Sequence, residues 1–436
     1  MRKIQYLVVI LLCISIVSPS LFTSATETVS HNKSENPMIC IYNGCKYIVW
    51  EESDEEGDTD IMFKNISDPR GRSYSIPDED EMGEDRSPFL IEYKSKLYCI
   101  WITDDNESSV GDDKDVVLRA YDGGSWGDII DVSTFSRSES SDDSSPKAVV
   151  FRDSMHIFWS NGTHLLTRSF DGDELSNQIA SIGKAGGVFD VERYGDKLYA
   201  AYTYRTISNN MMSVVKSYDG AWSDFEVEYN PGNDARDYAP DLEVYKDKLY
   251  IAWVTTDKSI SSGDVDDDVV IRSYDESKGS LSESKPWSNI TELSGFEVDH
   301  QDIWPVMTVF DDKLYVFWQT WNVETHSGNM GDDIGMRYYN GKRWSDFKAV
   351  TDDEKHDGGI YHPGIQVTST KDELLVCWQS RENKKYGDDW KIYYDVYDSI
   401  EKEDGGSQLN PYIIPAALIV MITAVIAYIF IRKKKD

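Results

Sequence analysis

The residues best suited to chemistry are aspartates that follow a glycine in five acidic loops, the first of which begins at Gly57-Asp58. Glycine permits a sharp turn, and carboxylate oxygens are the ligands that Ca²⁺ prefers. The pattern therefore predicts calcium at one or more of these loops. The candidate ligands are Asp58, Asp60, Asp112, Asp113, Asp115, Asp264, Asp266, Asp268, Asp332, Asp333, Asp388 and Asp389.

Two other interpretations of these aspartates remain open. Aspartate beside glycine also forms ordinary turns, and a rim of solvated carboxylates would show the same composition. The spacing does not match the twelve-residue calcium loop, which needs a distal glutamate.

A second group of polar and aromatic residues stands just before an apolar strand. Aromatic rings combined with carboxylates suit sugar binding, although the same rings can pack between sheets. Four histidines (His300, His326, His356 and His362) match no zinc spacing. The predicted ligand-binding residues are Arg86, Arg236, Asp237, Asp302, Trp304, Tyr361 and His362.

The elements that position these residues come from a repeat. A strand such as KLYIAW (248–253) or KLYVFW (313–318) ends in an aromatic residue and occurs seven times, 43 to 65 residues apart. A strand that often starts after proline precedes each copy, and two further strands follow it. Proline belongs at the first position of a strand because no ladder donor is lost there. The repeat unit is therefore four antiparallel strands.

The repeated strand distinguishes a propeller from a sandwich. In LYIAW (249–253) the residues that point to either face of the strand are apolar. In a two-layer sandwich one face of each sheet is exposed to solvent, so apolar and polar residues should alternate along the strand. A propeller blade is covered by a neighbour on each side. We therefore predict an all-β fold, a seven-bladed β-propeller of four-stranded antiparallel blades over residues 38–400.

The seventh repeat lacks a fourth strand. Because open strand edges are costly, we expect the N-terminal segment, 26–37, to supply the missing strand and close the ring. The turns between the first and second strands are short, whereas the loops after the second and fourth strands are long and share the opposite face. Loops with functional residues are expected on that long-loop face.

The two ends of the chain predict export and attachment to the membrane. Residues 1–25 have the basic start, apolar run and small-residue end of a secretory signal peptide. After a linker, 401–411, the uncharged stretch 412–431 is long enough for one transmembrane helix, and a basic cytoplasmic tail, 432–436, follows. We expect a single-pass protein of the cell membrane with an extracellular propeller, although the C-terminal segment could instead be a sorting signal that is removed.

Composition limits the partners. The formal net charge is −34, which repels phosphate backbones, so nucleic acid is not expected as a partner. Such a surface suits cations, basic partners or solubility alone. Cys40, Cys45, Cys99 and Cys377 are too few for a disulfide scaffold, and Cys40 and Cys45 would make a poor disulfide. Five glycosylation sequons suit a glycoprotein and begin at Asn32, Asn65, Asn106, Asn161 and Asn289.

Two turns resemble those of sialidase-like propellers, whose repeated turns read Ser-x-Asp-x-Gly-x-x-Trp. They are Ser217–Trp222 and Ala120–Trp126, each with glycine one place early. The sequence of the third strand is also similar to that of propellers on archaeal and bacterial cell surfaces. The resemblance implies a propeller over about 38–400. Sialidases use three arginines to hold a carboxylate, but only Arg86 and Arg236 precede a first strand here.

Three functional hypotheses follow. The favoured hypothesis is a membrane-anchored extracellular module that binds glycans or protein partners, assisted by calcium. The alternative is a sialidase-like or other glycoside hydrolase that uses the axial pocket. The third is a passive component of the cell envelope.

Overall fold

In the computed structural model the chain folds into seven β-sheets. The structure describes residues 27–30, 33–54, 57–76, 83–104, 113–133, 142–205, 211–223, 227–229, 235–257, 259–260, 267–294, 301–321, 333–351, 355–357, 364–382 and 390–398. The predicted signal peptide, linker, membrane helix and tail lie outside these ranges. Within them, no helix combines the length and apolar character that crossing a membrane requires.

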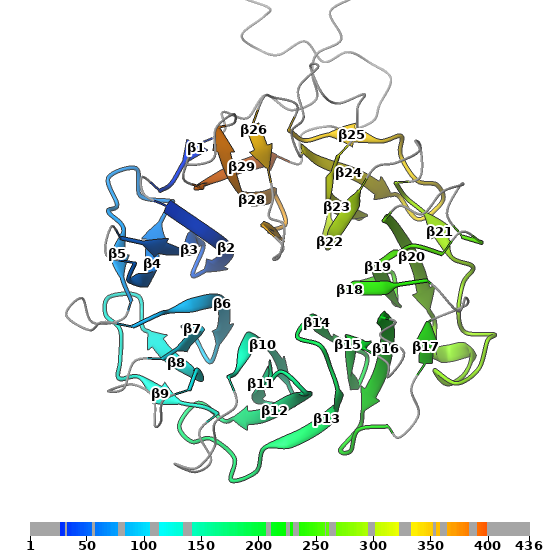
Figure 1. The fold of residues 1–436 in the computed structure, drawn as a ribbon, viewed down its shortest axis with the longest axis horizontal. Coiled ribbons are helices and arrows are strands. Elements are labelled where there is room, and N and C mark those ends of the chain that lie inside the picture. Colours follow the sequence, from blue (N-terminus) through cyan, green and yellow to red (C-terminus); the bar gives the residue numbers. More distant parts are fainter. Residues whose placement is uncertain are drawn as a thin grey trace, which may run out of the picture. The chain divides into compact units, whose positions relative to one another are not determined.

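The sheets are the blades of a propeller (Figure 1), and each is antiparallel. Blade 1 contains β2 (Lys33–Tyr42), β3 (Cys45–Ser53), β4 (Thr59–Asn65) and β5 (Tyr74–Ser75). Blade 2 contains β6 (Arg86–Tyr93), β7 (Lys96–Thr103), β8 (Asp115–Tyr121) and β9 (Ile130–Asp131). Blade 3 contains β10 (Ser144–Phe151), β11 (Ser154–Ser160), β12 (His164–Phe170) and β13 (Ala180–Lys184).

The remaining blades follow the same order along the chain. Blade 4 contains β14 (Phe189–Tyr194), β15 (Lys197–Arg205), β16 (Met211–Tyr218) and β17 (Val227–Tyr229). Blade 5 contains β18 (Asp237–Tyr245), β19 (Lys248–Thr255), β20 (Asp268–Tyr274) and β21 (Thr291–Glu292), with a 3-10 turn η1 (Glu276–Lys278). Blade 6 contains β22 (Asp302–Phe310), β23 (Lys313–Thr320), β24 (Asp333–Tyr339) and β25 (Lys348–Ala349).

Blade 7 is completed by the N-terminal segment, as the missing strand requires. Its own strands are β26 (Lys355–Asp357), β27 (Ile365–Ser369), β28 (Glu373–Glu382) and β29 (Lys391–Asp398), and β1 (Glu27–Thr28) pairs with β29. Just beyond β1, the Val29 amide donates to the Ile392 carbonyl at 2.8 Å. The last blade therefore contains both ends of the propeller sequence.

The hydrophobic core is divided among the blade interfaces. Buried apolar clusters bridge each neighbouring pair of blades, including the pair formed by blades 7 and 1. The second strands supply both faces. On β19, for example, Ile251 packs toward blade 4 and Ala252 toward blade 6. This double coverage explains why both parities of the repeated strand are apolar and confirms the predicted seven-bladed propeller.

The innermost strands begin with an unusual backbone turn. Five residues that precede a proline have φ between 51° and 56°, a region that side chains other than glycine rarely adopt. They are Asn36, Ser87, Ser145, Ala239 and Trp304. The pairing register shifts at each of these positions, which is the signature of a β-bulge.

The preceding blade provides hydrogen-bond acceptors for the backbone amides at several of these bulges. The Ser87 amide donates to Glu51 at 2.6 Å, and the Asn36 amide donates to Gln379 at 2.9 Å. In both cases the acceptor directly follows the aromatic residue that ends the repeated second-strand motif of the neighbouring blade. These hydrogen bonds therefore connect neighbouring blades near the axis, at the start of the inner strands.

At the opposite end of the inner strands, tyrosine hydroxyls join neighbouring blades. A tyrosine that ends the first strand donates to a backbone carbonyl in the first turn of the next blade. The bonds are Tyr42 to Ser95 (2.8 Å), Tyr93 to Asp153 (2.5 Å), Tyr194 to Asp247 (2.7 Å) and Tyr245 to Asp312 (2.6 Å). The two ends of the blades are thus fastened by different hydrogen bonds.

The four cysteines of the propeller are free thiols. Cys99 and Cys377 are buried within their strands, and Cys40 and Cys45 are partly buried on blade 1. The core, rather than disulfides, holds the ring together.

Candidate functional site

A cavity of about 350 Å³ lies among the innermost strands of blades 2 to 7. Its walls are contributed by β6, β10, β14, β18, β22 and β27. Of these, β6, β10, β14, β18 and β22 are labelled near the centre of the ring in Figure 1. The size falls within the range typical of small-ligand sites. Because six blades contribute to it, the cavity exists only in the closed ring.

Charged side chains enter this cavity from three consecutive blades. Lys147, Asp190 and Asp241 occupy equivalent register positions on the innermost strands, opposite Phe158, Ala201 and Ala252 of the second strands. The Lys147 ammonium contacts Asp190 Oδ1 at 2.7 Å.

The second carboxylate oxygen of each aspartate accepts a hydrogen bond from the next blade. Asp190 Oδ2 accepts from the Leu242 amide at 2.9 Å, and Asp241 Oδ2 accepts from the Met307 amide at 2.8 Å. Burial raises the pKa of Asp241 well above its usual value, and nearby Asp190 raises it further. Burial alone would lower the pKa of Lys147, but Asp190 and Asp241 outweigh that effect, and the net shift is upward.

Two glutamates lie one step further along the inner strands. Glu192 on β14 and Glu243 on β18 also line the cavity and are partly buried. Burial, followed by repulsion from Asp190, raises the pKa of Glu192 to about 7. Burial, followed by repulsion from Glu192, raises the pKa of Glu243 to about 8. The cavity therefore gathers four carboxylates around one ammonium.

Trp304 is the predicted binding residue that lines the cavity. It is 8% exposed and packs against Ala239 and Val254 of blade 5. Its backbone is left-handed, with φ 56°, which is a strained geometry for a bulky residue. Its indole Nε1 has no hydrogen-bond acceptor within the described part of the chain. Packing between blades, the alternative interpretation from the sequence, accounts for most of its surface.

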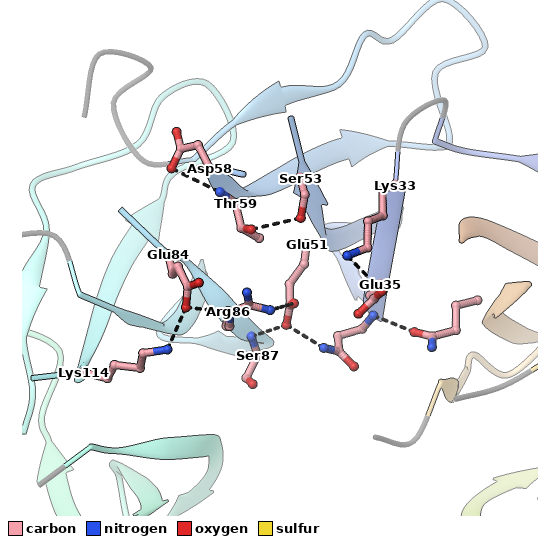
Figure 2. Close-up of polar contacts among 12 residues, drawn as sticks. Lys33, Glu35, Glu51, Ser53, Asp58, Thr59, Glu84, Arg86, Ser87 and Lys114 are labelled. Atoms are coloured by element: carbon pink, nitrogen blue, oxygen red, sulfur yellow. Dashed lines mark hydrogen bonds and ion pairs between the residues drawn. The ribbon is translucent and has the colours of Figure 1, made fainter. Parts of the chain in front are cut away.

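Arg86 belongs to a polar cluster between blades 1 and 2, where β6 begins (Figure 2). Its guanidinium contacts Glu51 at 3.6 Å and Glu84 at 3.3 Å. Glu84 also accepts from Lys114 at 2.8 Å, and hydrogen bonds from Lys114 and Arg86 lower the pKa of Glu84 to about 2. Arg86 remains 40% exposed, so it can contact a ligand as well as these carboxylates.

Glu51 is the buried member of this cluster. Its side chain is 3% exposed, and it accepts from the Ser87 amide and from Asn36 Nδ2 at 2.7 Å. Burial raises the pKa of this carboxyl despite those donors and Arg86. Glu51 therefore connects the two blades and positions Arg86 at the same time.

Asp237 and Asp302 form hydrogen bonds within their own blades. Asp237 accepts from the indole of Trp253 at 3.1 Å, and Asp302 accepts from the indole of Trp318 at 2.9 Å. Both aspartates are buried, with 1% and 6% of their surface exposed. The structure thus places these two predicted binding residues beneath the surface, where they satisfy buried tryptophans rather than present a carboxylate to solvent.

Arg236 is not among the residues that line the cavity. Arg236 is half exposed, and its guanidinium contacts Asp267 at 3.3 Å. Tyr361 and His362 lie outside the described residues. Of the predicted set, the structure therefore brings Trp304 into the cavity and Arg86 into a separate cluster.

The acidic loops are described only in part. Asp115 and Asp268 begin third strands and accept from serine hydroxyls of their own blades, at 3.2 and 3.3 Å. Asp58 accepts two backbone amides, as turn aspartates do, and Asp60 accepts from Ser75. Asp113 and Asp333 are buried. The other candidates lie outside the described residues: Asp112, Asp264, Asp266, Asp332, Asp388 and Asp389.

Across the part of the chain that is described, no three metal-ligating side chains come together. Asp58, Asp60, Asp115 and Asp268 use carboxylate oxygens for turns and for contacts within their blades. The calcium prediction therefore still depends on the acidic-loop residues for which the structure describes nothing.

The charged residues of the cavity were not among the predicted site residues. Lys147 and Asp241 each follow the proline of an inner strand directly, and Glu243 comes two residues later. A signal for them did exist, because alternate positions on an inner strand face one neighbouring blade. At the position of Lys147 and Asp241, three other repeats have the apolar residues Met38, Phe89 and Val306.

Known proteins are only distantly similar to this chain. No protein-family model matches the chain, and no curated protein matches it. One similar solved structure is a protein of unknown function from Dyadobacter fermentans, 11% identical, with TM-score 0.48, covering 85% of this chain and 97% of that one.

Two other solved structures come from proteins with stated activities. The α-L-arabinanase of Penicillium chrysogenum is 13% identical with TM-score 0.46 over 86% of this chain and 99% of that one. The β-propeller domain of the Trilobed protease from Pyrococcus furiosus is 11% identical with TM-score 0.47 over 85% and 100%. At these identities the likeness concerns the fold alone. The chain is a seven-bladed β-propeller, and no family model supports the sialidase resemblance.

Proposed function

We propose that this chain is a binding module of the cell surface whose axial cavity receives a glycan or a group from a protein partner. The cavity itself carries the proposal, because it combines about 350 Å³ of space with charged groups and a tryptophan. Catalysis is not required for these groups to recognise a ligand. The membrane anchor at 412–431 and the export signal at 1–25 would hold the propeller outside the cell.

Arg86 extends the proposed site beyond the cavity. It begins β6, the strand on which Phe89 and Ile91 line the cavity. A ligand larger than the cavity would therefore meet the guanidinium as it leaves the axis. Calcium at the acidic loops remains part of the proposal.

The test is a glycan array and a peptide array probed with the full-length chain and with a variant whose cavity is filled. Val149→Trp places a large ring among the lining residues, whereas Ser181→Trp adds the same ring at an exposed position on outer strand β13. We expect binding that Val149→Trp removes and Ser181→Trp retains. Binding that survives Val149→Trp would place the ligand elsewhere. Parallel arrays with calcium and with chelator test the metal.

A hydrolase of neutral glycans is the second candidate. Its support is the pairing of carboxylates with different proton affinities, because glycoside hydrolysis uses one protonated and one ionised carboxyl group. Glu192, with its pKa raised to about 7, could donate a proton at neutral pH. Release of reducing sugar by the wild type but not by Glu192→Gln would favour the enzyme over the binding module.

A further inference from the structure

The charges that line the axial cavity do not balance. Asp190, Glu192, Asp241 and Glu243 enter it from β14 and β18, whereas Lys147 from β10 is the cation opposite them. With all groups ionised, the carboxylates exceed the ammonium by three charges. Removing such charges from water is costly unless they are paired, so the cavity would gain stability from a cationic guest.

Lys147 shows which kind of cation the cavity accommodates. Lys147 lines the cavity, and its ammonium contacts Asp190 at 2.7 Å. The surrounding walls include apolar side chains such as Phe89, Val149 and Met307. Charge at the tip and hydrocarbon along the stem are the two features of an alkylammonium.

The two glutamates have no such partner. Glu192 Oε1 accepts from the Arg193 amide at 2.8 Å, and Glu243 Oε1 accepts from the Val244 amide at 2.9 Å. Within the described residues, neither glutamate forms an ion pair. Each therefore satisfies one oxygen with the following amide on its own strand and has no cation against the other.

Trp304 supplies an independent indication of a ligand. The residue is nine-tenths buried and is one of those that line the same cavity, and its indole Nε1 has no acceptor within the described part of the chain. Buried indole N–H groups usually find a partner. A guest beside the ring that carries a carbonyl or a hydroxyl near its cationic end would offer such an acceptor.

We infer that the axial cavity binds a primary alkylammonium group, with Glu192 and Glu243 as its counter-ions. The group comes either from a free diamine or from a lysine side chain of a peptide. The inference rests on the proposed use of the cavity and names the chemistry of its ligand. The acidic exterior of the chain favours the approach of such a cation.

Binding should depend on pH because the counter-ions must ionise. The pKa values of Glu192 and Glu243 are raised to about 7 and about 8, whereas a primary amine stays protonated to about pH 10. Lys147, Asp190 and Asp241 face the same space and Arg193 flanks it. The pKa of Asp241 is also raised well above its usual value, so its ionisation acts in the same direction as that of the two glutamates. The ammonium should bind more tightly as pH rises.

The experiment is calorimetric titration of the full-length chain with 1,5-diaminopentane at pH 6.0 and at pH 8.5. We expect binding about tenfold tighter at pH 8.5, accompanied by proton release at pH 7. Its neutral counterpart, 1,5-pentanediol, should bind at least tenfold more weakly. N-acetyl-lysine methylamide, which adds carbonyl groups, distinguishes the sources. A peptide source predicts that it binds more tightly than the diamine, and a free diamine predicts the reverse.

Three variants test the assignment of the counter-ions. Glu243→Gln should weaken diamine binding about tenfold at pH 8.5 and flatten its pH dependence. Glu174→Gln, an exposed carboxylate on the turn after β12, is the matched control and should change neither. Lys147→Met should strengthen binding, because it removes the positive charge that lines the same cavity and repels a second ammonium.

Several results would overturn the inference: no diamine binding at either pH, equal binding of pentanediol, or unchanged binding by Glu243→Gln. The failure would be separable from failure of the proposed function. If Val149→Trp abolishes glycan or peptide binding while diamines do not bind, the cavity is a site for another ligand. If array binding survives Val149→Trp and the diamine binds as expected, the cavity is an amine site and the main ligand lies elsewhere.

Discussion

At the scale of single residues, the cavity glutamates link the structure to pH. Glu192 and Glu243 have pKa values raised by burial above the usual value for glutamate. The folded state therefore holds protons that the unfolded chain releases. Their favourable contribution is complete below the unfolded pKa, about 4.3, and is lost as pH rises through about 7 and 8.

Glu243→Gln should consequently stabilise the protein at high pH. The amide stays neutral, so the variant should gain on the order of 2 kcal/mol over the wild type at pH 9 and little at pH 5. Urea unfolding at the two pH values measures the difference. Glu174→Gln should show no comparable gain, and equal stability of Glu243→Gln and wild type at pH 9 would contradict the raised pKa.

Asp302 allows a second prediction about a single residue. Its carboxylate accepts the indole N–H of Trp318, a fully buried side chain. Asp302→Ala removes that acceptor and should cost about 1–3 kcal/mol of unfolding free energy. Asp302→Asn retains a carbonyl acceptor and should cost less, and Asp346→Ala on the surface should cost almost nothing. Equal losses for Ala and Asn would mean that the indole bond contributes little.

At the scale of elements, the inner strands form two kinds of hydrogen bond between neighbouring blades. Where the strands start, backbone amides at the bulges donate to side-chain oxygens of the preceding blade, and where the strands finish, tyrosine hydroxyls donate to backbone carbonyls of the next blade. The bulges depend on a left-handed residue before proline, and the cost of that backbone is compensated by the neighbouring blade. The cavity lies along the strands between these two fastened ends.

The tyrosine bond can be tested on blade 5. Tyr245→Phe removes the hydroxyl that donates to the Asp312 carbonyl at 2.6 Å while keeping the buried ring. We expect a loss of about 1 kcal/mol, because a single net hydrogen bond is removed. Tyr74→Phe is the comparison: its ring is exposed and its hydroxyl accepts a long, solvent-exposed bond from the Trp126 indole at 3.3 Å, so the variant should lie within about 0.5 kcal/mol of the wild type. A neutral Tyr245→Phe would show that the ring alone joins the blades.

The elements were predictable to the extent that they repeat. Strands such as Lys248–Thr255 are apolar on both faces, and that single property distinguishes a blade from a sandwich sheet. The bulges were not predictable, because proline indicates a strand start but not the left-handed residue before it. The link between Lys147 and Asp190 joins residues 43 positions apart on different blades, and strand patterning does not show which inward-facing residues meet.

At the scale of the whole molecule, ring closure couples the ends of the chain. Val29 is 3% exposed and packs with Ile39 of blade 1 and Ile392 of blade 7. The incomplete seventh repeat made this closure predictable, because it left a strand edge without a partner. The location of the ligand site was less predictable, since it requires knowing how the blades lie around the axis.

Val29→Asp tests the closure. It buries a charge between the first and last blades and should lower the unfolding free energy by about 2–4 kcal/mol, with a clear fall in Tm. Glu27→Gln changes an exposed residue of the same segment and should leave Tm nearly unchanged. A Val29→Asp variant as stable as the wild type would show that the ring closes without this segment.

The axial cavity is the feature on which the proposed function depends most. A crystal structure of the chain with 1,5-diaminopentane bound, grown at pH 8.5, locates the ligand directly. We predict density for the diamine between β14 and β18, with one ammonium against Glu192 and Glu243. Density confined to the outer loops, with the cavity unchanged, would contradict the assignment of the axis as the binding site.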